Sequence, residues 1–406
     1  MYGYFKFELK QFFTNKKNLA IYFLLAFAAI FYAFNIAPAY DPIEKVDREE
    51  IEARYLTRQE FIDDLSKRDL WEVHPVTVDA YQMFSAINPM DKARMDALDA
   101  NDLKKYAEVT STWYFEMNYM TYYNEHLSYN DRYYVEDREF AYAEGFVNAM
   151  DQHYRYGAYK EADYELSIGV FEQRTALQTL ERLLKGPLPL ILIICSLLLA
   201  IDIVTKDRRH PSVLKGFPIA DWKKLLVKIC VAFIGSITLF VPLFIGFMVI
   251  GVQSGFGQLK LPSPEYAAVA VFIPLENNSL ADMLTLGMFL GRSLSLLILW
   301  FIVIINVVIL SSVLFRQEMV NLAAGLLVIF GEKFYISRGI GYFWEVEKVP
   351  TTYIHVGKVV SSYQNYYLGG DNVDYQYGLL LLTMCAVVLL VITLLISLNK
   401  RFKLVK

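Results

Sequence analysis

The chain has 406 residues, of which 55% are hydrophobic and 20% charged, and its formal net charge is −4. Residues 39–186 hold 30 Asp and Glu against 17 Lys and Arg, a net of −13, so the rest of the chain carries +9. Because the basic residues flank apolar stretches, the pattern is typical of a membrane protein and excludes the basic patch of a nucleic-acid-binding domain.

The first 18 residues predict a cytoplasmic amphipathic helix that lies in the membrane interface with its lysines toward anionic lipid. The alternative is an extension that only orients the first span. The apolar face of this helix carries Phe5, Leu9, Phe12 and Phe13, and the basic face carries Lys6, Lys10 and Lys17.

Residues 19–38 contain no charge and are long enough for a first transmembrane helix. The triplet Ala37-Pro38-Ala39 resembles the end of a signal peptide. The apolar run is longer than a signal peptide usually has, however, and a proline stands inside the cleavage motif, so we expect the helix to be retained.

Residues 39–186 predict a large, mainly helical extracellular domain between the first two spans. It contains 16 tyrosines. We expect them to pack a helical core, although aromatic residues in an acidic domain are also suited to binding a cationic peptide. The densest part of the series is Tyr119, Tyr122, Tyr123, Tyr129, Tyr133 and Tyr134.

Residues 187–406 predict five further transmembrane helices. The basic segments 1–18, 206–224 and 400–406 should all face the cytoplasm. Both termini then lie on one side, which requires an even number of spans and favours counting the short fifth one. The five expected spans are 188–205, 225–252, 284–315, 319–331 and 378–398.

Three charges fall inside these apolar spans. We expect Asp202 and Lys228 to reach the cytoplasmic surface by snorkelling. Arg292 lies either at the outer interface or beside an internal cavity, where it would be a candidate translocation residue. Gly287 and Gly291 just before it form a small-xxx-small pair that is suited to close helix packing or to a dimer contact.

Signatures of catalysis and metal binding are absent from the sequence. There is no G-x-x-x-x-G-K-[ST], H-E-x-x-H or G-x-S-x-G pattern, so no catalytic residue is assigned and ATP cannot bind through a P-loop. The five histidines are far apart along the chain, and the three cysteines lie in apolar stretches. We therefore expect no metal site and no cofactor bound by this chain.

The segment 206–224 joins the second and third spans and carries a recognisable order of residues. A charged cluster ends the second span, a small hydroxyl residue begins a short apolar stretch, and Pro-Ile follows before a lysine near the start of the third span, Lys228. This order resembles the permease subunits of type-2 ABC exporters, although the family's usual Gly-Thr or Gly-Ser is Pro211-Ser212 here. The resemblance covers the first 38 residues and the chain from Leu188 onward, and leaves out the extracellular domain.

The resemblance implies an all-α membrane protein with six spans whose loop contacts a separate ATPase. The apolar contact residues would be Ser212, Val213, Leu214, Phe217, Pro218, Ile219 and Trp222, with the charges Arg208, Arg209 and Lys215 at the rim. A short apolar helix in a partner's groove, bordered by such charges, is a common mode of docking.

The family further implies a dimer, formed with a second copy or a sister permease, in a bacterial plasma membrane and in contact with lipid. ATP and Mg²⁺ would bind to the partner ATPase. The expected substrate is amphipathic or hydrophobic, such as an antimicrobial peptide, a bacteriocin or a lipid-like compound. The alternative function is a membrane sensor or adaptor whose extracellular domain binds a ligand without transport.

Overall fold

The structure is a computed structural model, which describes residues 1–124, 127–129, 133, 141–206, 217, 219–265, 283–336, 345–368 and 372–399. The chain divides into two compact units. We call the first the helical bundle; it consists of Met1–Pro38, Ala176–Phe256 and Gly287–Lys406. We call the second the inserted domain; it consists of Ala39–Thr175 and Gly257–Leu286.

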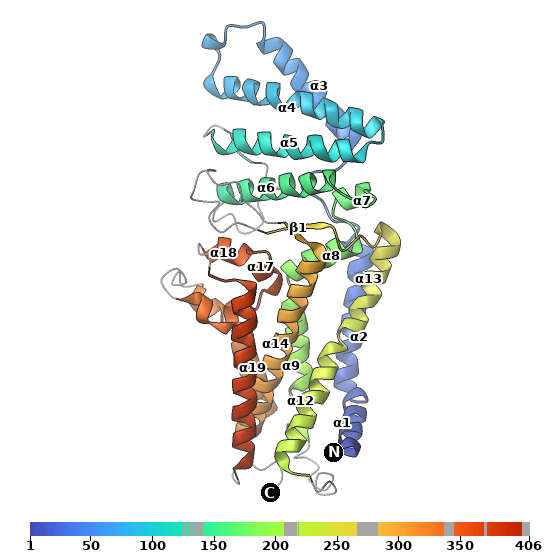
Figure 1. Ribbon diagram of the computed structural model, residues 1–406, viewed down its shortest axis with the longest axis vertical. Coiled ribbons are helices and arrows are strands. Elements are labelled where there is room, and N and C mark those ends of the chain that lie inside the picture. Colours follow the sequence, from blue (N-terminus) through green and yellow to red (C-terminus); the bar gives the residue numbers. More distant parts are fainter. Residues whose placement is uncertain are drawn as a thin grey trace. The chain divides into compact units, whose positions relative to one another are not determined.

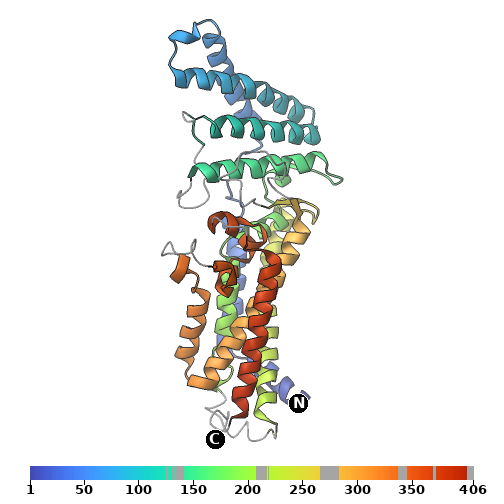
Figure 2. The same cartoon turned by 60° about the vertical axis from the view of Figure 1, so that its left-hand side comes forward.

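The helical bundle contains helices of very different length (Figures 1 and 2). The long or apolar ones are α1 (Tyr2–Phe13), α2 (Lys16–Phe31), α9 (Leu188–Ala200), α12 (Asp221–Ile237), α13 (Phe240–Ser254), α14 (Leu286–Phe315), α15 (Glu318–Ile329) and α19 (Tyr375–Leu398). The others are the π-helical turn η1 (Tyr32–Ile36), α8 (Ala176–Lys185), α16 (Lys333–Ile336), η5 (Val346–Lys348), η6 (Pro350–Tyr353), α17 (Val356–Val360) and α18 (Tyr363–Leu368).

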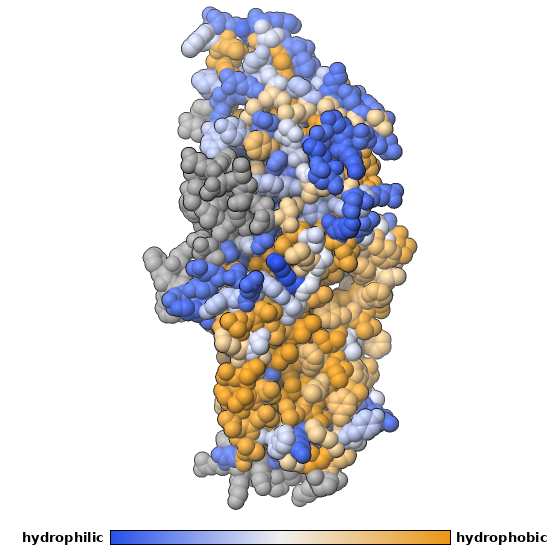
Figure 3. All heavy atoms as spheres, viewed as in Figure 1, coloured by the Kyte–Doolittle hydropathy of each residue, from blue (hydrophilic) through white to orange (hydrophobic). Residues whose placement is uncertain are grey.

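Four helical stretches are long and apolar enough to cross a membrane: Lys16–Ile36, Asp221–Ser254, Leu286–Phe315 and Tyr375–Leu398. They confirm a mainly α-helical protein with several apolar helices that are long enough to span a membrane. In Figure 3 the hydrophobic residues gather over the long helices of the bundle. The buried core lies mainly along α14, where Trp300, Phe301 and Ile304 are fully buried.

The second and fifth predicted spans are less regular. Ile168–Lys185 and Leu188–Ala200 pass the length and composition test only as a pair, bent by 71°. Gly186 and Pro187 stand at the break, where proline cannot continue a hydrogen-bonded helix. The α15 helix has 12 residues, about 18 Å at 1.5 Å per residue, which is shorter than the bilayer core. The number of six spans therefore stays a prediction.

The inserted domain is built from four main helices, each packed on the next in chain order (Figure 1). Two of their starts are fixed by aspartate caps: Asp47 accepts from Glu49 N and Glu50 N, and Asp102 accepts from Lys105 N. The helices are α3 (Arg48–Leu65), α4 (Pro75–Asp99), α5 (Leu103–Tyr122) and α6 (Ala141–Lys160), with the short η2 (Leu70–Glu72) and α7 (Ile168–Phe171).

A two-stranded antiparallel sheet is the one departure from helix in the described part of the inserted domain. The strands β1 (Pro262–Pro264) and β2 (Met283–Thr285) pair with Ser263 opposite Leu284. Arg155 of α6 donates to the carbonyl of Pro262 at 3.1 Å and so joins this sheet to the helices. The expectation of an all-α chain is therefore right for the architecture, but it missed this short pair of strands.

The predicted tyrosine core is found between α5 and α6. Tyr106, Tyr114, Tyr156 and Tyr159 are buried, and the rings of Tyr114 and Tyr156 stack with centroids 5.8 Å apart. In the residue series singled out above, Tyr129 and Tyr133 are also buried, Tyr122 packs on Phe146, Tyr119 and Tyr123 are exposed, and Tyr134 lies outside the described residues.

A buried carboxylate fastens α3 to α4. Asp91 is fully buried and receives three arginines: Arg54 at 3.1 Å, Arg58 at 2.8 Å and Arg94 at 2.9 Å. Arg94, which is also fully buried, donates to Thr110 Oγ1 and Tyr106 Oη of α5. One carboxylate therefore holds three helices together through charge-assisted hydrogen bonds.

Replacing Asp91 with alanine should strongly destabilise the inserted domain, because the buried Arg94 would lose its nearest counter-charge. We expect a loss of about 3–5 kcal/mol, the usual cost of breaking a buried pair from one side. Thermal unfolding of the full chain in detergent measures it. The control is Asp64→Ala, which removes an exposed pair with Arg68 and should cost at most about 1 kcal/mol. Equal effects of the two substitutions would contradict a structural role for Asp91.

Candidate functional site

The candidate site lies at the end of the bundle where α1 packs on α12. One face of α1 is buried, and it carries Tyr4, Glu8 and Phe12 at helical spacing. The ring of Phe12 covers Gly235 of α12, where an added Cβ would come within 2.2 Å of the ring. The α1 helix is thus clamped to a spanning helix along a buried face, whereas Lys6 and Lys10 are exposed.

An ion pair is buried in this contact. Lys228 Nζ of α12 lies 2.8 Å from Glu8 Oε1, and both side chains are fully buried. Lys228 also donates to the carbonyl oxygen of Ile203 at 2.8 Å, and Lys206 Nζ lies 3.7 Å from the second Glu8 oxygen. Three segments of the bundle therefore meet at one carboxylate. The expectation that Lys228 snorkels to the surface is wrong, because its ammonium group finds a buried counter-charge on α1.

Burial raises the pKa of the Glu8 carboxyl, but the charge and hydrogen bond of Lys228, together with a hydrogen bond from Tyr4 and the charge of Lys206, leave that pKa below its ordinary value. Because the pKa is depressed in the folded chain, ionised Glu8 stabilises the fold at neutral pH. This contribution is lost as the pH falls through the lowered pKa.

A second set of polar contacts lies close to this pair in sequence. Lys17 Nζ is 2.6 Å from Asp202 Oδ1 and also donates to the carbonyl oxygen of Leu198. Thr205 Oγ1 donates to Glu318 at 3.1 Å, and Asn321 donates to the carbonyl oxygen of Ile201 at 2.9 Å. The segment 198–206 is thereby fastened to α2 on one side and to α15 on the other. Asp202 is partly buried and forms an ion pair with Lys17, so its charge is stabilised by the protein as well as by solvent.

Most of the predicted ATPase-contact residues fall in or beside the segment 207–218. Arg208, Arg209, Ser212, Val213, Leu214, Lys215 and Pro218 lie outside the described residues. Phe217 is described, and its ring centroid is 5.2 Å from that of Tyr4 and 5.5 Å from that of Phe7. Ile219 is partly buried, and Trp222 is 36% exposed. The end of the loop therefore rests on the same helix that carries Glu8.

The remaining predicted residues lie near the start of α14. The Arg292 guanidinium carbon is 5.4 Å from the ring centroid of Tyr375, the first residue of α19. Gly291 is exposed, and an added Cβ there would meet no atom within 4 Å. Gly291 thus makes no close packing with the part of the chain that the structure describes, and the dimer contact stays a prediction for the Gly287 and Gly291 pair.

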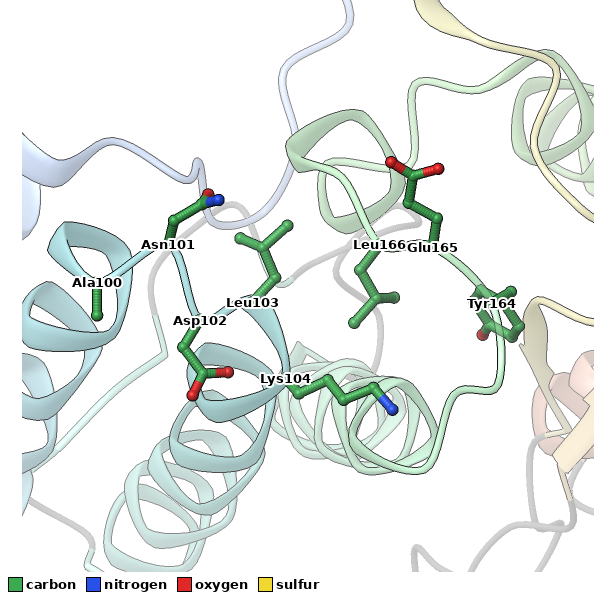
Figure 4. A pocket seen from close by; sticks show the side chains of 8 residues that line it. All are labelled: Ala100, Asn101, Asp102, Leu103, Lys104, Tyr164, Glu165 and Leu166. Atoms are coloured by element: carbon green, nitrogen blue, oxygen red, sulfur yellow. The ribbon is translucent and has the colours of Figure 1, made fainter.

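The inserted domain has a cavity of about 440 Å³ between residues 100–104 and 164–166 (Figure 4). The side chains of Leu103 and Leu166 lie between the two segments, with Lys104 and Glu165 near them (Figure 4). Asp102 in its wall is engaged as the cap of α5. The lining combines no set of groups that would act on a substrate, so we assign no function to it.

Glu8 is the functional candidate that the sequence analysis missed. It stands four residues from both Tyr4 and Phe12, on an aromatic face of an otherwise lysine-rich helix. A lone acidic residue in that position, with a lysine inside the third predicted span, was a signal for a buried pair.

No family model matches this chain, and searches of curated proteins and of solved structures find no match either. The resemblance to exporter permeases consequently rests on residues 206–228 and on the arrangement of the predicted spans, and the function built on it is a proposal.

A double-mutant cycle tests the pair. Lys228→Leu leaves the Glu8 carboxylate buried without its main partner and should cost about 3–5 kcal/mol of stability. The combination with Glu8→Leu should recover much of that loss, since two apolar side chains need no counter-charge. Thermal unfolding of the purified chain in detergent gives the four stabilities. Lys10→Leu, on the exposed face of α1, is the control and should change little. Additive losses in the double variant would rule out a direct pair.

Proposed function

We propose that this chain is the membrane-spanning permease subunit of an ABC exporter, and that the ATPase is a separate subunit. The observation that carries the proposal is the contact of Phe217 with α1, together with the buried Glu8–Lys228 pair that fastens α1 to α12. A transporter driven from outside the bilayer needs a stiff connection between the driven loop and the spanning helices. Buried ion pairs and aromatic contacts supply such a connection.

The proposed mechanism begins at the segment 206–224. A movement of the ATPase pushes on the apolar residues 212–214. Phe217 passes the displacement to α1 through Tyr4 and Phe7, whose ring centroids lie within 5.5 Å of its own. The α1 helix then moves α12 through Glu8 and Phe12. Sliding the ion pair apart inside the protein is costly, so α1 and α12 move together.

The partners follow from the same proposal. The chain has no P-loop, so ATP and Mg²⁺ bind to the ATPase subunit, and hydrolysis is not an activity of this chain. The working unit contains two permeases in a bacterial plasma membrane, with both termini and the segment 206–224 on the ATPase side. In the bundle, α1 and the end of α19 lie at the same end (Figures 1 and 2), which supports this orientation.

The proposed substrate class follows from the lipid bilayer that would surround the spanning helices. Substrates that partition into the bilayer, such as amphipathic peptides, bacteriocins and lipid-like compounds, can reach the spanning helices directly. The competing function is a sensor whose inserted domain binds a ligand without transport. Under that function the segment 206–224 would have no ATPase to contact.

Replacing Leu214 with Asp should abolish co-purification of an ABC ATPase co-expressed as the proposed partner subunit, because a charge would enter an apolar interface at a cost of several kcal/mol. Arg208→Ala and Lys215→Ala should weaken the association only modestly, as rim charges usually do. The measurement is a pull-down from membranes at matched expression. Wild-type retention of the ATPase by Leu214→Asp would contradict the proposed docking.

Phe217→Ala separates docking from coupling. Phe217 contacts α1 of its own chain, so its loss should leave much of the ATPase binding intact while lowering the ATPase stimulation by the complex. Phe23→Ala is the matched aromatic control, because Phe23 is 73% exposed and belongs neither to α1 nor to the segment 206–224. A normal stimulation in Phe217→Ala would remove α1 from the coupling path.

A further inference from the structure

A groove of about 350 Å³ lies in the helical bundle between α2, η1, α8, α9 and α13. Its walls are apolar, with two hydroxyl groups, those of Tyr32 and Thr179, as the polar side-chain atoms of the lining. The Thr179 oxygen already accepts a hydrogen bond from Arg182 at 3.2 Å. The groove thus offers few groups that could recognise a polar ligand, and its volume is within the usual range for a small-molecule site.

The sequence creates this groove with small residues and two helix irregularities. Ala28 and Ala29 on α2 and Gly246 on α13 leave space where larger side chains would close it. The first spanning helix widens to a π-helical turn at Tyr32–Ile36, and π-turns in α-helices often occur at functional sites. On the other side, the break at Gly186 and Pro187 directs α8 away from the line of α9.

The groove opens on the apolar outer surface of the bundle. Ile36 and Ile191, which line it, are 50% and 44% exposed, and Ala28 is also exposed. The α2 helix also exposes Phe27 and Phe31, so its apolar surface extends beyond the mouth of the groove. These residues belong to apolar helices that are long enough to span a membrane, α9 only together with α8, so a surrounding bilayer would place hydrocarbon at the mouth of the groove.

We propose that this groove is a binding site for one acyl chain of a membrane phospholipid. Inside a bilayer the groove is already out of water, so the hydrophobic effect does not drive binding. The acyl chain is held by dispersion contacts with the apolar walls, which an empty groove would lack. A flexible hydrocarbon chain can follow the irregular walls, and it brings no polar group that the lining would leave without a partner. The headgroup stays at the membrane surface, so the groove recognises the acyl chain of the phospholipid and makes no contact that distinguishes one headgroup from another.

The proposal does not depend on coupling to an ATPase, so it can fail or succeed independently of the exporter function. The test is native mass spectrometry of the full chain purified in mild detergent from liposomes of phosphatidylcholine and phosphatidylglycerol. Wild type should retain one phospholipid mass. Ala28→Trp, which fills the groove from its exposed wall, should lose that mass.

The matched control is Ala20→Trp, because Ala20 is exposed on the same helix but does not line the groove. It should keep the bound phospholipid. Ile191→Trp fills the groove from α9 and provides a second variant if Ala28→Trp is poorly folded by circular dichroism. Absence of the lipid mass from wild type, its retention in both groove variants, or its equal loss in Ala20→Trp would overturn the proposal.

A photoreactive benzophenone side chain at position 191 identifies the occupant in liposomes. An adduct with the mass of one phospholipid supports the acyl-chain site. A cross-link to a second copy of the chain, without a lipid adduct, would show that the groove is a dimer contact and would overturn the proposal.

Discussion

The buried pair of Glu8 and Lys228 is the interaction on which the rest of the bundle depends. Two fully buried charges are costly to remove from water, and their mutual attraction offsets that cost only when the geometry is good. Here the distance is 2.8 Å, and Lys228 makes a further hydrogen bond to Ile203. The pair therefore fixes which face of α1 meets α12, and it does so with little tolerance for sliding.

Other contacts take their place from this fixed point. Where α1 packs on α12, the ring of Phe12 covers Gly235. The ring of Phe217 packs against those of Tyr4 and Phe7 on the same helix. The turn from α1 into α2 brings Lys17 to Asp202, so the end of α9 is fastened to α2 as well. A force applied to the segment 206–224 would consequently reach two spanning helices by short polar and aromatic contacts.

The inserted domain uses the same device for a different purpose. Asp91 collects three arginines and ties the helices α3 and α4 to α5 through Arg94. Here the buried charges lie where α3, α4 and α5 meet, and the tyrosine core lies on the other side of α5, against α6. Both units thus rely on a single buried carboxylate to define helix packing.

Hydrophobicity and length made the long helices predictable. The first, third, fourth and sixth predicted spans fall within the four helical stretches Lys16–Ile36, Asp221–Ser254, Leu286–Phe315 and Tyr375–Leu398, to within a few residues. The helical inserted domain with a tyrosine core was also predictable from its composition, which combines helix-favouring charged residues with 16 tyrosines between residues 39 and 186. The break at Gly186-Pro187 was signalled by the two residues themselves.

What the sequence could not provide were the partners of the charges. Lys228 was expected at the surface because a lone lysine in an apolar span usually extends its ammonium group to water. Its partner, Glu8, lies 220 residues away along the chain. The acyl-chain groove was equally hidden, because it depends on how alanines from one helix face a glycine on another. The strand pair at Pro262–Pro264 and Met283–Thr285 was missed because three-residue strands carry no periodic signal.

The central claim is that this chain is moved by a separate ATPase. The most direct test is the ATP hydrolysis rate of the proposed ABC ATPase subunit in liposomes, measured with and without the reconstituted chain. We expect assembly with the chain to raise the rate, and Lys228→Leu to lower that stimulation while Lys10→Leu preserves it. An ATPase whose rate and membrane association do not respond to the chain would contradict the exporter assignment.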